Sequence, residues 1–91
     1  MDISYDPAKN ARNIAERGLS FDRVAAFDFK TALFVVDNRY DYGEVRYRAL
    51  GKMNGRVHAL VFVENPTGIR VISFRKANKR EVKYYEEATK S

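Results

Sequence analysis

Arginine side chains recur in this sequence at a spacing that suits phosphate binding. Arg46 and Arg48 lie two residues apart in a stretch of strand-forming residues, so both are expected on one face of a strand. A guanidinium group can donate two parallel hydrogen bonds to a phosphate and can stabilise the charge that develops when a phosphodiester is cleaved. The alternative is an ordinary solvated sheet face, which commonly carries charges.

A second basic group surrounds the last expected strand. Arg70 begins this strand and Arg75 ends it, and their odd separation places them on opposite faces unless a bulge or the strand end reorients Arg75. Four positive charges then fall within six positions, at Arg75, Lys76, Lys79 and Arg80. Because positive charge is unfavourable at a helix N-terminus, this run suggests an anionic partner. A solvated helix start explains it equally well.

Cleavage of RNA without a metal also needs groups that remove and donate protons. Glu81 and Tyr84 lie three residues apart on an expected helix and therefore share a face. They can supply a base and a hydroxyl. They can equally anchor the helix, with Glu81 paired to a nearby arginine.

The single histidine, His58, is the other candidate for acid–base chemistry or RNA contact, since only histidine titrates near neutrality when unperturbed. It shares a strand face with Leu60 and Phe62, which favours a packed side chain instead. With one His and no Cys, no metal site and no cofactor are expected.

Tyrosines alternate with arginines between positions 39 and 48, at Tyr40, Tyr42 and Tyr47. Aromatic rings among basic groups suit the stacking of bases in single-stranded RNA. This makes Tyr47 a candidate RNA contact beside Arg48. Ordinary surface packing is the alternative.

The composition is that of one folded domain over residues 1–91. Apolar residues make up 45% of the chain and aromatic residues 13%, which disordered chains lack. The net charge is +5, which favours an anionic partner. The lack of Cys fits the reducing cytoplasm, and neither a membrane span nor a signal peptide is expected.

The N-terminal elements predicted to position these residues are a short strand and two helices. The strand covers Asp2–Tyr5, and the first helix, Pro7–Arg17, is started by Asp6 and stopped by Gly18. A second helix begins at Ser20. Its expected core-facing residues are Phe21, Val24, Ala25 and Phe27.

The rest of the chain predicts four strands and a closing helix. Apolar residues 32–36 fit either a buried strand or an edge that meets a partner, and residues 37–43 form a loop. Residues 45–53 and 56–64 form a hairpin around Asn54-Gly55, because a type I′ turn needs positive φ at both central positions. A strand over residues 69–75 and a helix over residues 78–88 follow.

The predicted order is β-α-α-β-β-β-β-α, an α+β fold with an antiparallel meander. The two N-terminal helices cover one face of the sheet. The last helix packs at an edge or end of the sheet, or stays mobile until a partner binds.

Four segments resemble the BrnT family of toxins, in register over nearly the whole chain. The first is an aromatic-Asp-Pro-x-Lys opening at residues 5–13, and the second is a Gly-Leu-Ser-Phe junction at residues 18–21. The third is a Glu-x-Arg strand that ends in Gly, at residues 44–51. The fourth is an Arg-Val-Ile-Ser-x-Arg-x-Ala segment at residues 70–77, which is followed by Glu81 and Tyr84. The resemblance implies a RelE-like fold and an endoribonuclease. It also makes Lys9 a candidate site residue.

The resemblance further implies partners. A BrnA-like antitoxin would mask the toxin, and the complex, not the toxin alone, would bind operator DNA. This chain departs from the family at Glu16-Arg17-Gly18, where members often carry Lys-His-Gly. Arg17 stays protonated at working pH, so it can stabilise an anion but cannot act as a base.

Three functions therefore compete. The first is an endoribonuclease toxin with catalytic candidates Lys9, Arg46, Arg70, Arg75, Glu81 and Tyr84, and RNA-binding candidates Tyr47, Arg48, His58, Lys76, Lys79 and Arg80. The second is a non-catalytic nucleic-acid-binding module or co-repressor. The third is a domain whose basic face docks an acidic partner protein.

Overall fold

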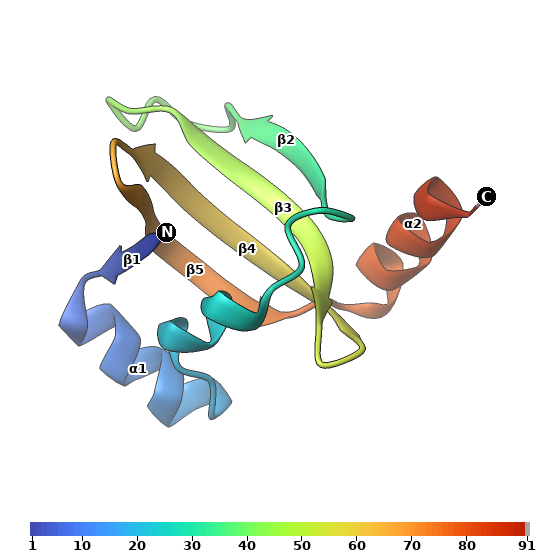
Figure 1. Ribbon diagram of the computed structural model, residues 1–91, viewed down its shortest axis with the longest axis horizontal. Helices are drawn as coiled ribbons and strands as arrows, with labels where there is room; N and C mark the ends of the chain where they lie inside the picture. The colour runs from blue at the N-terminus through green and yellow to red at the C-terminus, as the bar shows by residue number, and fades with distance from the viewer. Residues whose placement is uncertain (91) are drawn as a thin grey trace.

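The protein is an α+β structure built on a five-stranded, mostly antiparallel sheet (Figure 1). The computed structural model describes residues 1–90. The strand order is β1-β5-β4-β3-β2, and among the strand pairs of these 90 residues only β1–β5 is parallel. The elements follow the chain as β1 (Asp2–Tyr5), α1 (Pro7–Arg17), the 3₁₀ helix η1 (Phe21–Ala26), β2 (Leu33–Asp37), β3 (Arg46–Met53), β4 (Arg56–Asn65), β5 (Gly68–Lys76) and α2 (Lys79–Thr89).

Helix α1 has the predicted bounds and the predicted caps. The Asp6 side chain accepts a hydrogen bond from the Ala8 N–H, and Gly18 ends the helix in the left-handed conformation at φ 64°. The helix contributes no buried side chain. Instead, Asn10 accepts a hydrogen bond from the Phe21 N–H, while Asn13 donates to the Leu19 and Phe74 carbonyls.

The second predicted helix is a 3₁₀ helix rather than an α-helix. Ser20 caps it as expected, and Phe21, Val24 and Phe27 are buried. The period of three brings these side chains to one side. Ala25 is exposed, so its predicted place in the core is wrong. The prediction of two α-helices packed on the sheet is therefore correct only in part, because α1 is attached mainly through its two asparagines.

The main core lies between one face of the sheet and the segment Leu19–Phe27. We call this face the covered face; α1 and η1 lie on its side of the sheet in Figure 1. Leu60, Val71 and Phe74 are at most 1% exposed. Gly51 makes room for Phe27, because a Cβ at Gly51 would lie 2.5 Å from the Phe27 ring.

The predicted turn between β3 and β4 is confirmed. Asn54 has φ 52° and Gly55 has φ 77°, the positive values that a type I′ hairpin requires. The turn fixes the register in which Arg48 faces Val61 and Ala49 faces Leu60. Ala49 and Leu60 belong to the covered face, so Arg48 lies on the opposite one, which we call the open face.

An irregularity in β5 determines where its two arginines lie. Val61 pairs with Ser73 and Phe62 with Val71, which leaves Ile72 as one extra residue between them. Arg70 therefore pairs with Val63 and Arg75 with Ala59. Residues 59, 61 and 63 share a face, so the bulge brings Arg70 and Arg75 together on the open face.

Helix α2 packs across one end of the open face. Asn78 and Glu81 form a capping box at its start, and Tyr85 is buried. Tyr85 and its neighbour Val82 belong to a second small core. The sheet side of this core is made by Leu33, Leu50 and Val57. None of the helices in residues 1–90 has the length and apolar character needed to cross a membrane.

Candidate anion-binding site

The part of the open face that α2 leaves uncovered forms a groove of about 930 Å³. Strands β2 to β5 make its floor, and α2 makes one wall. Its charged and hydroxyl-bearing lining residues are Asp37, Arg39, Tyr42, Arg46, Arg48, Ser73, Arg75, Arg80, Glu81 and Tyr84. Five of these ten side chains are arginines, so the groove is an electropositive concavity suited to an anionic ligand.

Strand alternation and the bulge position the floor arginines. Arg46 and Arg48 alternate with the covered-face residues of β3 and line the groove together, as their spacing predicts. Arg75 reaches the same groove from β5. Within residues 1–90, Arg48 takes part in no ion pair and is exposed. Its guanidinium is therefore free to bind a ligand.

Glu81 holds Arg75 at the groove through a two-point ion pair. The Arg75 Nη1 and Nη2 atoms lie 2.7 and 2.9 Å from the two Glu81 carboxylate oxygens. The same carboxylate accepts a hydrogen bond from the Asn78 N–H. The Arg75 guanidinium lowers the pKa of Glu81, and the Glu81 carboxylate raises the pKa of Arg75. The sequence predicts that Glu81 either anchors the helix or acts as a base, and this geometry favours the anchor.

Tyr84 and Arg80 come from the α2 wall. Tyr84 is 60% exposed and lines the groove, three residues from Glu81 on the same helix. Within residues 1–90, the tyrosine hydroxyls that form hydrogen bonds are those of Tyr5, Tyr42 and Tyr85, so the Tyr84 hydroxyl is unpaired. Tyr84 thus offers the groove an unpaired hydroxyl from the α2 wall, and Ser73 offers one from the floor.

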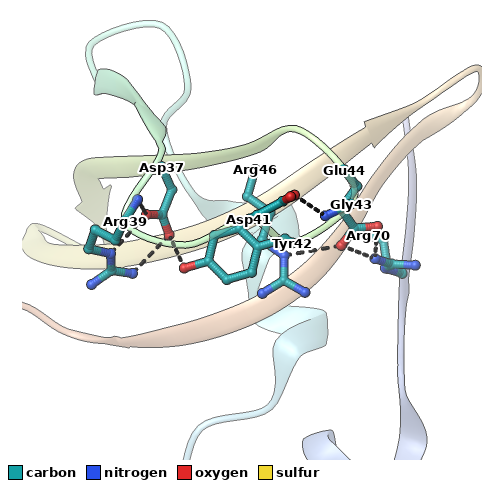
Figure 2. Close-up of polar contacts among 8 residues, drawn as sticks. All are labelled: Asp37, Arg39, Asp41, Tyr42, Gly43, Glu44, Arg46 and Arg70. Atoms are coloured by element: carbon teal, nitrogen blue, oxygen red, sulfur yellow. Dashed lines mark hydrogen bonds and ion pairs between the residues drawn. The ribbon is translucent and has the colours of Figure 1, made fainter.

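A network in the β2–β3 connection orients Arg46 (Figure 2). Asp37 is 4% exposed, and both its oxygens accept hydrogen bonds from the Arg39 guanidinium at 2.8 Å. Arg39 thereby holds the pKa of Asp37 far below its usual range. The Tyr42 hydroxyl also donates to Asp37, and the Arg46 guanidinium carbon lies 4.1 Å from the centre of the Tyr42 ring.

Glu44 links Arg46 to Arg70 at the other end of this network. Its Oε2 atom lies 3.0 Å from Arg46 Nε and 2.7 Å from Arg70 Nη2. Hydrogen bonds from the two guanidinium groups lower the pKa of Glu44. Arg46 and Arg70 also line a second pocket of about 390 Å³ together with Lys9.

The structure thus divides the six predicted catalytic residues between two neighbouring pockets. Arg75, Glu81 and Tyr84 line the groove, Lys9 and Arg70 line the second pocket, and Arg46 lines both.

Of the predicted RNA-binding residues, only Arg48 and Arg80 line the groove. Tyr47 packs against the main core and stacks on Phe62, with ring centres 5.6 Å apart. Lys76 pairs with His58 in the ladder and so has the covered-face orientation. Lys79 is exposed at the start of α2, outside both pockets.

His58 lies on the covered face, away from the arginines. It is 3% exposed, stacks on Phe74 with ring centres 5.3 Å apart, and its Nδ1 lies 2.8 Å from the Arg56 carbonyl oxygen. Burial lowers its pKa. His58 is therefore a packed side chain, which was the alternative to an acid–base role, and it lines neither pocket.

The roles of Asp37 and Glu44 as partners of the site arginines are not predicted from the sequence. Residues 37–43 are predicted only as a polar loop, and Glu44 enters only as part of a family resemblance. One signal was present: each carboxylate lies two residues from an arginine, at Arg39 and Arg46. Within residues 1–90, no group of three or more His, Cys, Asp or Glu side chains is arranged to hold a metal ion.

One comparison with known proteins identifies a family. A family model described as the ribonuclease toxin BrnT of type II toxin–antitoxin systems matches residues 5–81 of the 91-residue chain. The matched range contains both pockets except Ser4 and Tyr84. No curated protein and no solved structure gives a significant match.

Proposed function

The chain belongs to the BrnT family of ribonuclease toxins of type II toxin–antitoxin systems, and from this premise we propose that its open face binds and cleaves RNA. The observation that supports this most strongly is the gathering of Arg46, Arg48, Arg75 and Arg80 in one groove. RNA is a polyanion, and its binding depends first on such cations. We treat residues 1–91 as one toxin domain with the RelE-like arrangement that the family resemblance implies.

The proposed reaction is attack of the ribose 2′-oxygen on the adjacent phosphorus. The 2′-hydroxyl gives its proton to water, the phosphorus–oxygen bond to the 5′-oxygen breaks, and the leaving 5′-oxygen takes a proton from the Tyr84 hydroxyl, which regains one from water. The products are a 2′,3′-cyclic phosphate and a 5′-hydroxyl. Arg48 and Arg75 stabilise the negative charge on the pentacoordinate phosphorus. Such stabilisation needs no metal, so cleavage should proceed in EDTA.

Two α2 residues complete the proposed site. Glu81 holds the Arg75 guanidinium through two hydrogen bonds and acts as a positioning residue. Tyr84 offers an unpaired hydroxyl to the groove and is the proposed proton donor to the leaving 5′-oxygen.

We infer the biological setting from the family description, which supports an antitoxin partner. A BrnA-like antitoxin neutralises the toxin, and the complex of the two binds operator DNA. Released toxin cleaves RNA in the cytoplasm and so inhibits translation and growth.

The test is cleavage of a defined single-stranded RNA in EDTA by the parent protein and by Arg48→Ala. Arg48 makes no ion pair in residues 1–90, so its removal leaves no carboxylate unpaired. Lys52→Ala is the matched control, because Lys52 lies on the same strand and face, outside the groove. We expect cleavage by the parent and by Lys52→Ala, and a loss of about 10²-fold in Arg48→Ala.

A second candidate function is a nucleic-acid-binding module without turnover. It is favoured by one observation: both Asp37 and Glu81 in the groove are ion-paired, and their pKa values are lowered, so they are weak bases. Salt-dependent RNA binding by a folded parent that cleaves no RNA would select this alternative.

A further inference from the structure

The second pocket lies beside the groove, where β1 ends and α1 begins. It is lined by Ser4, Tyr5, Asp6, Lys9, Arg46, Arg70, Val71 and Ile72. Arg46 is the residue that it shares with the groove. The two pockets are therefore neighbouring parts of one positively charged surface.

Three cations meet at this pocket, and most of their N–H groups are unused. Within residues 1–90, the side-chain hydrogen bonds of Arg46 come from Nε alone, and those of Arg70 come from Nη2 alone. Lys9 makes no ion pair in this part of the chain. The Asp6 carboxylate is engaged in capping α1. The pocket can thus donate several further hydrogen bonds to an anion.

The Glu44 carboxylate already binds two of these cations, Arg46 and Arg70. Both of its oxygens lie within 2.8 Å of Arg70 Nη2, and one also lies 3.0 Å from Arg46 Nε (Figure 2). A carboxylate and a phosphate present paired oxygens to guanidinium groups in the same way. Glu44 follows Gly43, at φ 71°, and its side chain is 29% exposed, so a ligand can approach it from solvent.

Because of the bulge, Arg70 and Arg75 lie opposite Val63 and Ala59, which are four positions apart on β4, or roughly 13 Å at about 3.3 Å per residue. A stacked strand advances on the order of 3.4 Å per nucleotide, so about four stacked nucleotides span this distance. One RNA strand can therefore reach both pockets.

We propose that the pocket at Lys9, Arg46 and Arg70 binds a phosphate of the RNA strand that flanks the cleaved bond, and that Glu44 occupies the phosphate position until the strand arrives. This inference rests on the proposed function, because it assumes that the groove holds RNA. It assigns Lys9 and Arg70 to binding rather than to the cleavage step.

The test measures binding of a 2′-O-methyl RNA decamer and trimer, which lack the attacking hydroxyl and cannot be cleaved by this reaction. Lys9→Ala and Arg70→Ala should each bind the decamer at least about fivefold more weakly. Each should also reduce the slope of log K against log salt by about 0.7. Trimer binding should be unchanged, because a trimer need not reach this pocket.

The matched control for Lys9→Ala is Arg12→Ala, which removes one charge from the same helix outside both pockets. It should bind the decamer like the parent. Glu44→Gln keeps the hydrogen-bonding shape but removes the competing charge, so it should bind the decamer more tightly. Circular dichroism checks that each variant is folded.

The outcomes separate this inference from the proposed function. If Arg48→Ala weakens decamer binding while Lys9→Ala and Arg70→Ala do not, RNA binding by the groove is supported and the proposed flanking subsite is wrong. If Glu44→Gln binds more weakly, Glu44 positions the arginines and its proposed exchange with phosphate is wrong. If Lys9→Ala and Arg70→Ala weaken only antitoxin binding, the pocket takes a protein partner and the proposal is overturned.

Discussion

The two faces of the sheet are built from the same strands but are held together differently. The covered face is apolar, with Leu60, Val71 and Phe74 at most 1% exposed. The open face carries arginines oriented by carboxylates, as in the pair of Arg75 with Glu81. Because side chains alternate along a strand, neighbouring residues serve opposite faces. Stability and ligand binding can therefore be changed separately by substitutions one residue apart.

The largest expected effect is on the covered face. Phe74→Ala removes a side chain with no exposed surface, whose ring packs edge-on against Phe27 with centres 6.2 Å apart. The resulting cavity should lower the free energy of unfolding by about 3–5 kcal/mol, measured by urea denaturation. Ser73→Ala, one residue away on the open face, should change it by less than about 1 kcal/mol. Similar losses in the two variants would contradict the division of roles.

The next effect is on the open face and concerns activity. Arg75→Ala should reduce RNA cleavage by about 10²–10³-fold, because it removes charge stabilisation at the reacting phosphate. Its Glu81 partner is partly exposed, so we expect a stability loss of no more than about 1 kcal/mol.

Lys76→Ala is the control for Arg75→Ala. It removes the same charge from the next residue, which has the covered-face orientation, and should leave cleavage nearly unchanged. Equal losses in both variants would mean that net charge, rather than the groove, determines activity.

The features that the sequence predicts best are those determined by neighbouring residues in the chain. Asp6, Pro7 and Gly18 bound α1 correctly, and Asn54-Gly55 gives the right hairpin, because caps and tight turns depend on a few adjacent residues. The same reasoning put Arg46 and Arg48 on one face. These predictions need no knowledge of distant contacts.

What the sequence did not reveal depends on tertiary pairing. The bulge at Ile72, which turns Arg70 and Arg75 to one face, exists only in the register with β4. Tyr47 is an exception, because strand alternation alone places it on the face opposite Arg46 and Arg48. Glu44 and Arg70, which form part of the Arg46–Glu44–Arg70 bridge, are 26 positions apart, and no local pattern predicts such a contact.

Glu81→Gln tests whether the α2 carboxylate is an anchor or a base. Glutamine keeps an oxygen that can accept from Arg75 and Asn78, so a positioning role predicts less than about a tenfold loss of cleavage. A general base would cost about 10²–10⁴-fold and would remove the acidic limb of the pH–rate profile. Cleavage rates of parent and variant between pH 5 and 9 distinguish the two, and a loss of the larger size would reverse the assignment.

The smallest expected effect returns to the covered face, at His58. Burial lowers the pKa of His58, whereas in the unfolded chain the side chain titrates at about 6.5. Between the folded and unfolded pKa values the unfolded state binds more protons, so stability falls as pH drops from above 6.5 through the folded pKa. Each unit of difference between the two values corresponds to about 1.4 kcal/mol.

The paired carboxylates of the open face contribute in a different pH range. The pKa values of Asp37, Glu44 and Glu81 are lowered, so the stability that they add is complete above about pH 4.5 and is lost only in stronger acid. Unfolding free energies at pH 7.5, 6.5 and 5.5 therefore isolate His58. The parent should lose stability across this range and His58→Gln should lose less, because glutamine does not titrate. Equal slopes would show that the acid sensitivity does not come from the covered face, and the two faces would then have to be compared below pH 4.5.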